Sequence, residues 1–183
     1  MSQDLSGKRV QLLKEAFPKL AHLAIVFAPG IPTNPPLANA AEQAATAMGI
    51  RVTRIELRQT TDVDTAVQRA KSAGAQAFMV FASAFTQARR AILVKESLDQ
   101  QLPGIYYDGE FVASGGFMSY ATSPEIYRRA ATIVDKILTG ANPGDLPAEQ
   151  PTSFELMINL KSAAILGIPV PNSLQLRADQ LFK

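Results

Sequence analysis

Residues 22–58 read HLAIVFAPGIPTNPPLANAAEQAATAMGIRVTRIELR, and the succession of patterns in this stretch decides the fold class. A continuous apolar run of strand length, residues 22–29, is followed by Asn34 and Pro35, which are typical of a helix cap and a first helical position. After an Ala-rich helix, residues 51–58 alternate apolar and charged side chains, as a half-buried strand does. Strand, helix and strand in this order indicate an α/β fold.

The same alternation continues along the chain. A capping box at Thr61 and Asp64 predicts the next helix, and residues 76–82 form another apolar run. A helix is expected over residues 85–101, and residues 103–107 give a fourth strand. Near-continuous apolar strands separated by helices favour a parallel sheet covered on both faces, which is the doubly wound α/β architecture.

The expected strand order 2-1-3-4 places a switch in strand order between the first and third strands. Doubly wound sheets bind ligands beside this switch, at the carboxyl ends of the strands. We therefore expect ligand contacts from Asn34, Ser83 and Phe85, which follow those two strands. The alternatives are structural, since Asn34 also reads as a helix cap, Ser83 as a residue that satisfies its own helix start, and Phe85 as a packing residue.

Tyr107, Asp108, Glu110 and Phe111 follow the fourth strand and form the strongest cluster of candidate ligand-binding residues. Two acids suit an ammonium group, and two rings suit an apolar side chain. A solvated turn with one buried aromatic ring is the structural alternative. A small α/β enzyme that uses Asp108 and Glu110 as acid and base is a further alternative.

The second half of the chain has a different pattern. Gly115 and Gly116 break the chain before a short strand at residues 117–120, and Ser123-Pro124-Glu125 predicts the start of a helix. One face of that helix is apolar and is formed by Ile126, Ala130, Ile133, Val134, Ile137 and Leu138. A further strand is expected at residues 154–159, followed by a short helix.

Composition and missing motifs exclude several classes of protein. The chain has 183 residues, a formal net charge of +2 and no cysteine, and it carries no basic stripe typical of a nucleic-acid-binding protein. No fingerprint of a hydrolase, a metalloprotease or a nucleotide-binding loop occurs, so no catalytic residue, cofactor or metal site is expected. The single histidine, His22, stands at the start of a buried strand, opposite the ligand edge, and is interpreted as structural.

Four segments carry a resemblance to a known family. They are LSGKRVQLLKEAFP (5–18), EFVASGGFMSY (110–120), YRRAATIVDKILTGANPGDLPAEQPTSFELMINLKSAAILGI (127–168) and PNSLQLRAD (171–179). On these motifs the chain resembles the ABC-transporter substrate-binding proteins of the tryptophan/tyrosine-type family. The resemblance implies a periplasmic binding protein with two lobes, which traps a solute between them, and the family name suggests an aromatic amino acid as that solute.

The resemblance also implies a division of this chain into segments and a set of binding partners. It implies an interlobe helix at 1–17, a second lobe at 18–104, a returning part of the first lobe at 105–150 and a crossing segment at 151–183, with most of the first lobe and the signal peptide lacking. The implied partners are a small-molecule solute and an ABC permease with its ATPase, and the implied location is periplasmic. Open edges predict self-association. A ligand-sensing regulatory domain is the alternative function.

Overall fold

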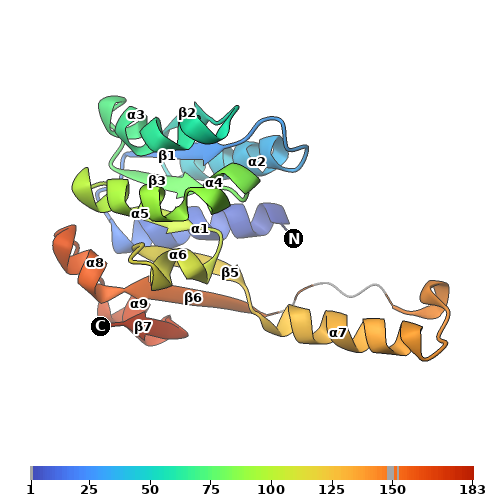
Figure 1. Ribbon diagram of the computed structural model, residues 1–183. Coiled ribbons are helices and arrows are strands. Elements are labelled where there is room, and N and C mark those ends of the chain that lie inside the picture. Colours follow the sequence, from blue (N-terminus) through green and yellow to red (C-terminus); the bar gives the residue numbers. More distant parts are fainter. Residues whose placement is uncertain (1, 148–150, 152) are drawn as a thin grey trace.

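The computed structural model describes residues 2–147, 151 and 153–183. In this part of the chain seven strands form one sheet (Figure 1). The strands are β1 (His22–Phe27), β2 (Arg51–Glu56), β3 (Ala77–Val80), β4 (Gly104–Tyr106), β5 (Met118–Thr122), β6 (Phe154–Asn159) and β7 (Gln180–Phe182).

The strand order is β2-β1-β3-β4-β5-β6-β7, which confirms the order 2-1-3-4 expected for the first four strands. The first five strands in this order, β2, β1, β3, β4 and β5, are parallel. Their carboxyl ends therefore share one edge of the sheet, which we call the carboxyl edge. Strand β6 is antiparallel to β5, and β7 is parallel to β6. The C-terminal tail therefore returns to the same sheet.

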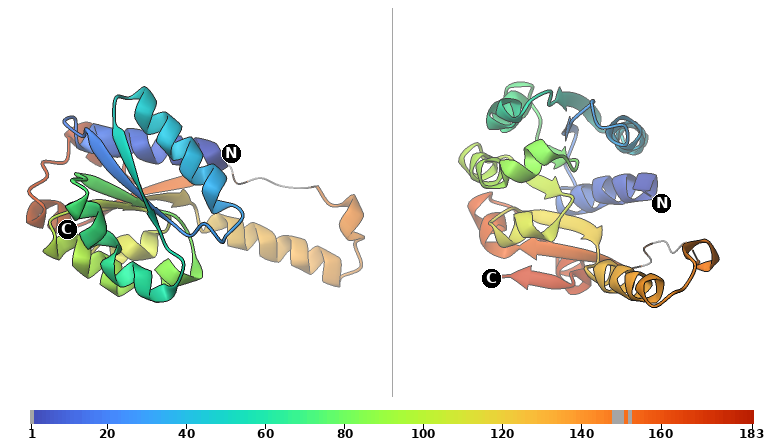
Figure 2. Two further views of the ribbon diagram at one scale, coloured as in Figure 1. Left: turned by 90° about the horizontal axis from the view of Figure 1, so that it is seen from above. Right: turned by 45° about the vertical axis from the view of Figure 1, so that its right-hand side comes forward.

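Helices cover both faces of this sheet, and α7 projects away from it (Figure 2). The helices in the described part of the chain are α1 (Ser2–Ala16), α2 (Asn34–Ala47), α3 (Ala66–Ser72), α4 (Ala84–Ala88), α5 (Arg90–Asp99), α6 (Gly109–Ala113), α7 (Glu125–Leu138), α8 (Leu160–Ile165) and α9 (Asn172–Arg177), with 3-10 turns η1 (Thr60–Thr65) and η2 (Pro143–Asp145). Helices α1 and α2 lie on the first face, and α3, α5 and α6 lie on the second.

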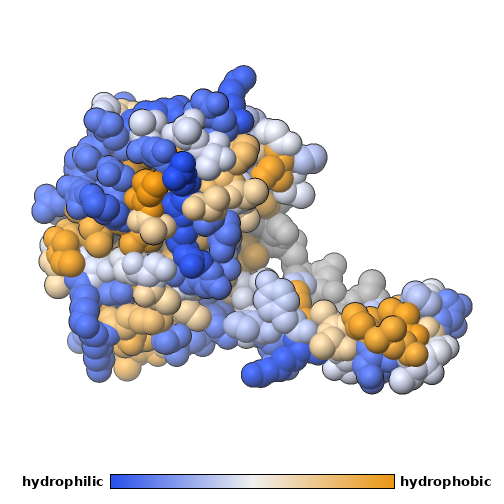
Figure 3. Space-filling model, viewed as in Figure 1, coloured by the Kyte–Doolittle hydropathy of each residue, from blue (hydrophilic) through white to orange (hydrophobic). Residues whose placement is uncertain are grey.

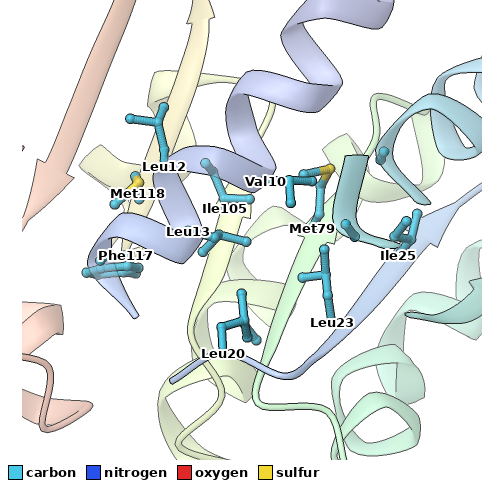
Figure 4. Close-up of a cluster of buried hydrophobic side chains, with 14 of the residues drawn as sticks. Val10, Leu12, Leu13, Leu20, Leu23, Ile25, Met79, Ile105, Phe117 and Met118 are labelled. Carbon is cyan, nitrogen blue, oxygen red and sulfur yellow. The ribbon is translucent and has the colours of Figure 1, made fainter. Parts of the chain in front are cut away.

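Alternating side chains along each strand supply one core to each face. On the first face Leu23 and Met79 meet Val10 and Leu13 of α1 (Figure 4). All four of these side chains are fully buried, and burying a leucine or valine side chain stabilises a fold by about 1.5–3 kcal/mol. Helix α1, whose apolar residues follow only an approximate helical spacing, thus contributes to the layer that covers the first face.

The core of the second face is built around aromatic rings. Phe78 and Tyr106 meet edge to face with ring centroids 5.7 Å apart, and Phe111 stacks on Tyr106 at 4.8 Å. Gly116 permits this packing, because a Cβ at that position would stand 2.7 Å from the Phe111 carbonyl oxygen and from the Tyr106 ring. The Gly-Gly bend that the sequence shows therefore serves close packing under α6.

Strands β5 and β6 are antiparallel neighbours, yet a long excursion of the chain separates them. The Ser123 N–H donates to the Ser153 carbonyl at 3.0 Å and closes the neck of this excursion. Beyond the neck, α7 projects away from the layered part of the molecule (Figures 1 and 2). We call residues 123–147 the arm, and the sheet with the helices that cover it the body.

Several element starts differ from the sequence prediction. Helix α2 begins at Asn34 with Thr33 as its N-cap, so the predicted cap is shifted by one residue. The capping box that opens η1 joins Gln59 and Asp62 rather than Thr61 and Asp64. The helix predicted over residues 85–101 is split into α4 and α5, because Arg89 leaves the helical region with φ −113° and ψ 23°.

The strand pairing can be compared with the segments into which the resemblance divides the chain. Strand β4 pairs with β5, and β5 with β6, so the sheet continues without a break past residue 104. Helix α1, expected between lobes, packs on the first face of the body. Among the described residues it is the arm that leaves the sheet. Which lobe of a longer protein each part belongs to stays a prediction.

Candidate functional site

A first cavity lies at the carboxyl edge, at the switch in strand order, and has a volume of about 640 Å³. Its lining comes from the segments that follow β1, β2 and β3, as the rule for doubly wound sheets predicts. The lining residues are Ala28, Pro29, Gly30, Ile31, Leu57, Arg58, Ser83, Ala84 and Phe85. We call this space the switch cavity.

Two residues predicted to contact a ligand, Ser83 and Phe85, line the switch cavity. Ser83 is also the N-cap of α4: its hydroxyl accepts from the Thr86 N–H at 3.0 Å, and its own N–H donates to the Thr86 hydroxyl at 3.1 Å. Both groups of this box are thereby satisfied inside the protein. Phe85 is half-buried, and its lining position suits contact with an apolar group of a solute.

Asn34 does not line the switch cavity and does not cap α2. Its side chain is buried, and its amide nitrogen donates to the Ala82 carbonyl at 3.1 Å, which ties the start of α2 to the segment after β3. The amide oxygen has no hydrogen-bond partner among the described residues. Pro35 and Pro36 remove two N–H groups from the first turn of α2, so this helix start is a poor anion site.

A second cavity, of about 650 Å³, lies at the same edge beyond the end of β4. It lies among the start of α6, the neck of the arm and the β5–β7 part of the sheet. The lining residues are Tyr107, Asp108, Gly109, Glu110, Ala113, Ser119, Ala121, Thr122, Pro124, Tyr127, Glu155, Met157, Gln180 and Phe182. We call this space the acidic hollow, since its lining includes three carboxylates and neither lysine, arginine nor histidine.

A chain of hydrogen bonds joins the start of α6 to α4. The Tyr107 hydroxyl donates to the Gln87 side-chain oxygen at 2.9 Å, and the Gln87 amide donates to the Glu110 carboxylate at 3.3 Å. Glu110 also forms an ion pair with Arg90. Burial raises the pKa of Tyr107 above its ordinary value, so its hydroxyl stays protonated and able to donate at neutral pH.

The structure separates the remaining predicted residues. Asp108 is the N-cap of α6, and its carboxylate accepts from the Glu110 N–H at 2.8 Å. Phe111 is fully buried between Tyr106 and Tyr107, so the interpretation of Phe111 as a ring that covers a solute is wrong. Its place one turn into α6, a helix that the sequence analysis did not predict, turns the ring inward.

Sequence reasoning missed several lining residues. Arg58 comes two residues after the end of β2, near the same edge as Ser83, whereas the sequence pattern predicts a strand that continues to residue 58. Ser119 and Glu155 are polar residues inside β5 and β6, on the faces opposite the first core. Polar positions that alternate with apolar ones in a buried strand would have been the usable signal.

His22 lies at the start of β1, at the edge opposite both cavities, as the sequence predicts. Its Nε2 lies 2.8 Å from the Thr53 hydroxyl, and its Nδ1 lies 2.9 Å from an Arg51 guanidinium nitrogen. These contacts join β1 to β2 and support the structural interpretation of the ring.

Among the described residues, no group of three or more His, Asp or Glu side chains is arranged to hold a metal ion. None of the helices in the described part of the chain combines the length and apolar character needed to cross a membrane.

Comparison with known families gives one match. Residues 3–182 match the family model described as ABC transporter substrate binding protein, which covers nearly the whole chain. No curated protein sequence matches the chain significantly.

Solved structures share the fold at low sequence identity. A conserved domain protein from Vibrio cholerae matches with a TM-score of 0.87 and 22% identity over 96% of this chain and 60% of that one. An ABC domain in complex with L-Trp from Streptococcus pneumonia matches with a TM-score of 0.88 and 19% identity over 97% of this chain and 60% of that one. A periplasmic solute-binding protein from Actinobacillus succinogenes with bound D-allose matches with a TM-score of 0.64 and 14% identity, over 89% and 60%. The chain thus spans about 60% of the length of each of these structures.

Proposed function

Because this chain belongs to the family of ABC transporter substrate-binding proteins, we propose that it supplies one wall of a site that binds a small solute without chemical change. The observation that carries this proposal is the switch cavity, which opens at the carboxyl edge between the segments after β1 and β3. Ser83, Phe85 and the unpredicted Arg58 provide polar, aromatic and cationic contacts there. Such a mixture orients a small molecule and covers its apolar part.

The arm supports a site with a second wall. Its helix α7 is strongly amphipathic, yet none of its residues is buried in the described part of the chain. Figure 3 shows an apolar patch on this projecting helix, where Val134, Ile137 and Leu138 are exposed. The solved relatives are longer than this chain, and we propose that their additional length provides a lobe that packs on α7 and faces the switch cavity.

The transport role and the solute that we propose are suggested by the family. We propose that the closed complex delivers its solute to an ABC permease driven by an ATPase, in the periplasm or an equivalent extracytoplasmic space. An aromatic amino acid is our first candidate solute. The structure in complex with L-Trp supports this choice, and Phe85 offers a ring for the side chain, whereas the D-allose complex makes sugars the comparison class.

Solute binding is tested by NMR on the 183-residue chain, since amide shifts detect the weak binding that one wall provides. Tryptophan, tyrosine and allose are titrated while the amide signals of residues 28–31, 57–58 and 83–85 are followed. We expect saturable shifts with an aromatic amino acid, reduced in Phe85→Ala and retained in Ile165→Ala, a control at an exposed site on α8. Shifts that never saturate, for every solute in a broad metabolite panel, would count against the function.

For the chain on its own, we propose that a second copy covers the apolar face of α7. An exposed apolar helix face of this kind favours association over exposure to water. Light scattering after gel filtration should give a mass above that of a monomer, increasing with concentration. Val134→Glu combined with Leu138→Glu should shift the protein toward monomer, whereas Leu176→Glu on α9, which also replaces an exposed leucine, should not. A monodisperse monomer at high concentration would contradict the proposal.

A further inference from the structure

Arg9 lies in α1 and is almost entirely buried, with 7% of its surface exposed. Its Nε–H donates to the Tyr120 carbonyl of β5 at 2.8 Å, across a separation of 111 residues in the sequence. Arg9 is not among the residues that line the switch cavity or the acidic hollow. Its buried position therefore needs an explanation other than contact with a solute.

The backbone groups of Tyr120 do not take part in the ladder between β5 and β6. In an antiparallel ladder, hydrogen-bonded pairs alternate with pairs that are not bonded. The Ser123 N–H donates to the Ser153 carbonyl at one end of this ladder, and the Asn159 N–H donates to the Phe117 carbonyl at the other. The odd-numbered residues of β5 are therefore the bonded ones, and the Tyr120 carbonyl points away from β6, toward the side of β4.

Strand β4 does not supply a partner for this carbonyl. Its last residue, Tyr106, is in register with Ser119, one position short of Tyr120. None of the described N–H groups that follow β4 donates to the Tyr120 carbonyl. Arg9 reaches it from α1 and takes the place of the missing strand residue, because backbone carbonyls in a sheet need a hydrogen-bond partner.

A buried guanidinium is a costly donor for one carbonyl. Burial lowers the pKa of Arg9 to about 10, although the neighbouring Tyr120 opposes the shift, so the side chain keeps its charge at neutral pH. Because the pKa is lowered, no neighbouring acid among the described residues compensates for the lost hydration. An apolar side chain of similar length would avoid this cost, so stability alone does not explain an arginine here. A charged donor gives a stronger and more directional bond.

This bond lies at the base of the arm. Tyr120 comes shortly before the neck, and its ring packs on that of Phe154, on the returning strand β6, with centroids 5.8 Å apart. One turn further along α1, Leu12 lies beside Met118 at the start of β5 (Figure 4). Helix α1 thus follows β5 from its start toward the neck, and Arg9 holds it at the end from which the arm leaves.

We propose that Arg9 is a positioning residue, which fixes the direction of the arm by holding the end of β5 against α1. This role rests on the proposed function, in which the arm carries the surface that a second wall covers. The direction of the arm then determines how that wall meets the switch cavity. Arg9 itself contacts no solute.

Hydrogen exchange, measured by NMR on the 183-residue chain, compares two N–H groups of one ladder. The Ser123 N–H lies at the neck, and the Asn159 N–H, which donates to the Phe117 carbonyl at 2.9 Å, lies at the far end. Arg9→Met removes the donor and keeps the length of the side chain. It should accelerate exchange of the Ser123 N–H about tenfold relative to that of the Asn159 N–H, because the neck opens more often.

Two further variants separate positioning from general stability. Arg9→Lys keeps a charged donor and should restore most of the protection of the Ser123 N–H. Lys14→Met removes a bond of the same kind from the same helix, since Lys14 Nζ donates to the Leu20 carbonyl at 2.8 Å, away from the neck. It should change the two exchange rates by the same factor.

The direction of the arm is measured by double electron–electron resonance. The chain has no cysteine, so Gln43→Cys on α2 and Asp135→Cys on the polar side of α7 introduce one spin label in the body and one in the arm, both at exposed positions. The labelled chain is diluted with an excess of unlabelled chain, which removes distances between copies. The parent should give one narrow distribution of distances, and Arg9→Met should broaden it.

The outcomes separate the positioning role from the proposed function. Equal acceleration of both N–H groups in Arg9→Met, the same preferential acceleration in Lys14→Met, or a broad distance distribution in the parent would overturn the positioning role. If Arg9→Met does not fold, Arg9→Gln, whose side chain is too short for the same bond, replaces it in both measurements. If the role is confirmed but no tryptophan, tyrosine or allose binds the chain, the proposed function alone is wrong. If a solute binds at the switch cavity and exchange in Arg9→Met matches the parent, the positioning role alone is wrong.

Discussion

Helices α1 and α7 have similar lengths, but α1 buries apolar residues against the body and α7, among the described residues, buries none. The apolar residues of α1 follow helical spacing only loosely, yet Val10, Leu12 and Leu13 are buried against the sheet and α2. The apolar face of α7 is the more regular of the two, yet Val134 and Leu138 remain exposed. A regular amphipathic pattern thus predicts which face of a helix favours burial, but it does not predict which surface covers that face.

Chain connections explain the difference. Helix α1 is joined to β1 by a short segment, residues 17–21, so it is held against the first face. Helix α7 leaves from β5 and returns through β6, and the bond between Ser123 and Ser153 closes the chain behind it. The body therefore does not bury the apolar face of α7, and α7 does not contribute a buried side chain to the core of the body.

The largest effect that tests this comparison comes from one substitution made in each helix. Leu13→Ala removes a fully buried side chain and should lower the free energy of unfolding by about 2–5 kcal/mol. Leu138→Ala, the same change at a side chain that is 81% exposed, should alter it by less than about 0.5 kcal/mol. Urea unfolding followed by circular dichroism measures both, at a protein concentration low enough to suppress association. Equal losses in the two variants would show that α7 is covered in solution.

The sequence predicted the β1–β4 part of the body because its pattern is local. Apolar runs such as residues 22–27 and 77–80 mark buried parallel strands, and the order around β1 follows from few possible connections. The rule that ligands bind beside the switch in strand order directed attention to Ser83 and Phe85, which do line a cavity. These predictions needed no knowledge of distant contacts.

Several misses depend on contacts between distant segments. Phe111 is buried in the second core together with residues of β1, β3 and α5, which lie far from it in the sequence. Ser119 and Glu155 line one cavity only because β5 pairs with β6, whose residues lie on the far side of the arm in the sequence. Asn34 reads as a cap, yet its side chain is held by the Ala82 carbonyl of another segment.

A second test compares two asparagine caps, one in the body and one in the arm. Asn159 caps α8 and also donates to the Val112 carbonyl at 3.2 Å, and it is buried. Asn159→Ala should lower the free energy of unfolding by about 1–3 kcal/mol, because buried groups of Ser162 and Val112 lose their partner. Asn142→Ala removes an exposed cap of η2 in the arm and should cost less than about 0.5 kcal/mol.

Chemical denaturation measures the free energy of unfolding of both asparagine variants, and the dependence of that free energy on denaturant concentration is compared between them. A loss in Asn142→Ala as large as that in Asn159→Ala would mean that the arm and the body unfold as one unit, contrary to their separation in the structure.

The smallest expected effect comes from a substitution at Asp62. It tests whether the burial of a side chain, rather than its position in the body, determines how much stability its removal costs. Asp62 belongs to the body but is only partly buried at its surface, and its carboxylate accepts from the Arg58 N–H at 2.7 Å and the Gln59 N–H at 3.2 Å. The Arg58 N–H, more than any other group, lowers the pKa of Asp62 below its ordinary 3.8. A carboxylate with a lowered pKa stabilises the folded state above the ordinary pKa, and this contribution is lost as the pH falls through the lowered value. Asp62→Asn should therefore melt at a slightly lower temperature than the parent chain at pH 7, and the difference should shrink steadily below pH 3.8. A difference that does not depend on pH would assign the effect to the shape of the capping box rather than to its charge.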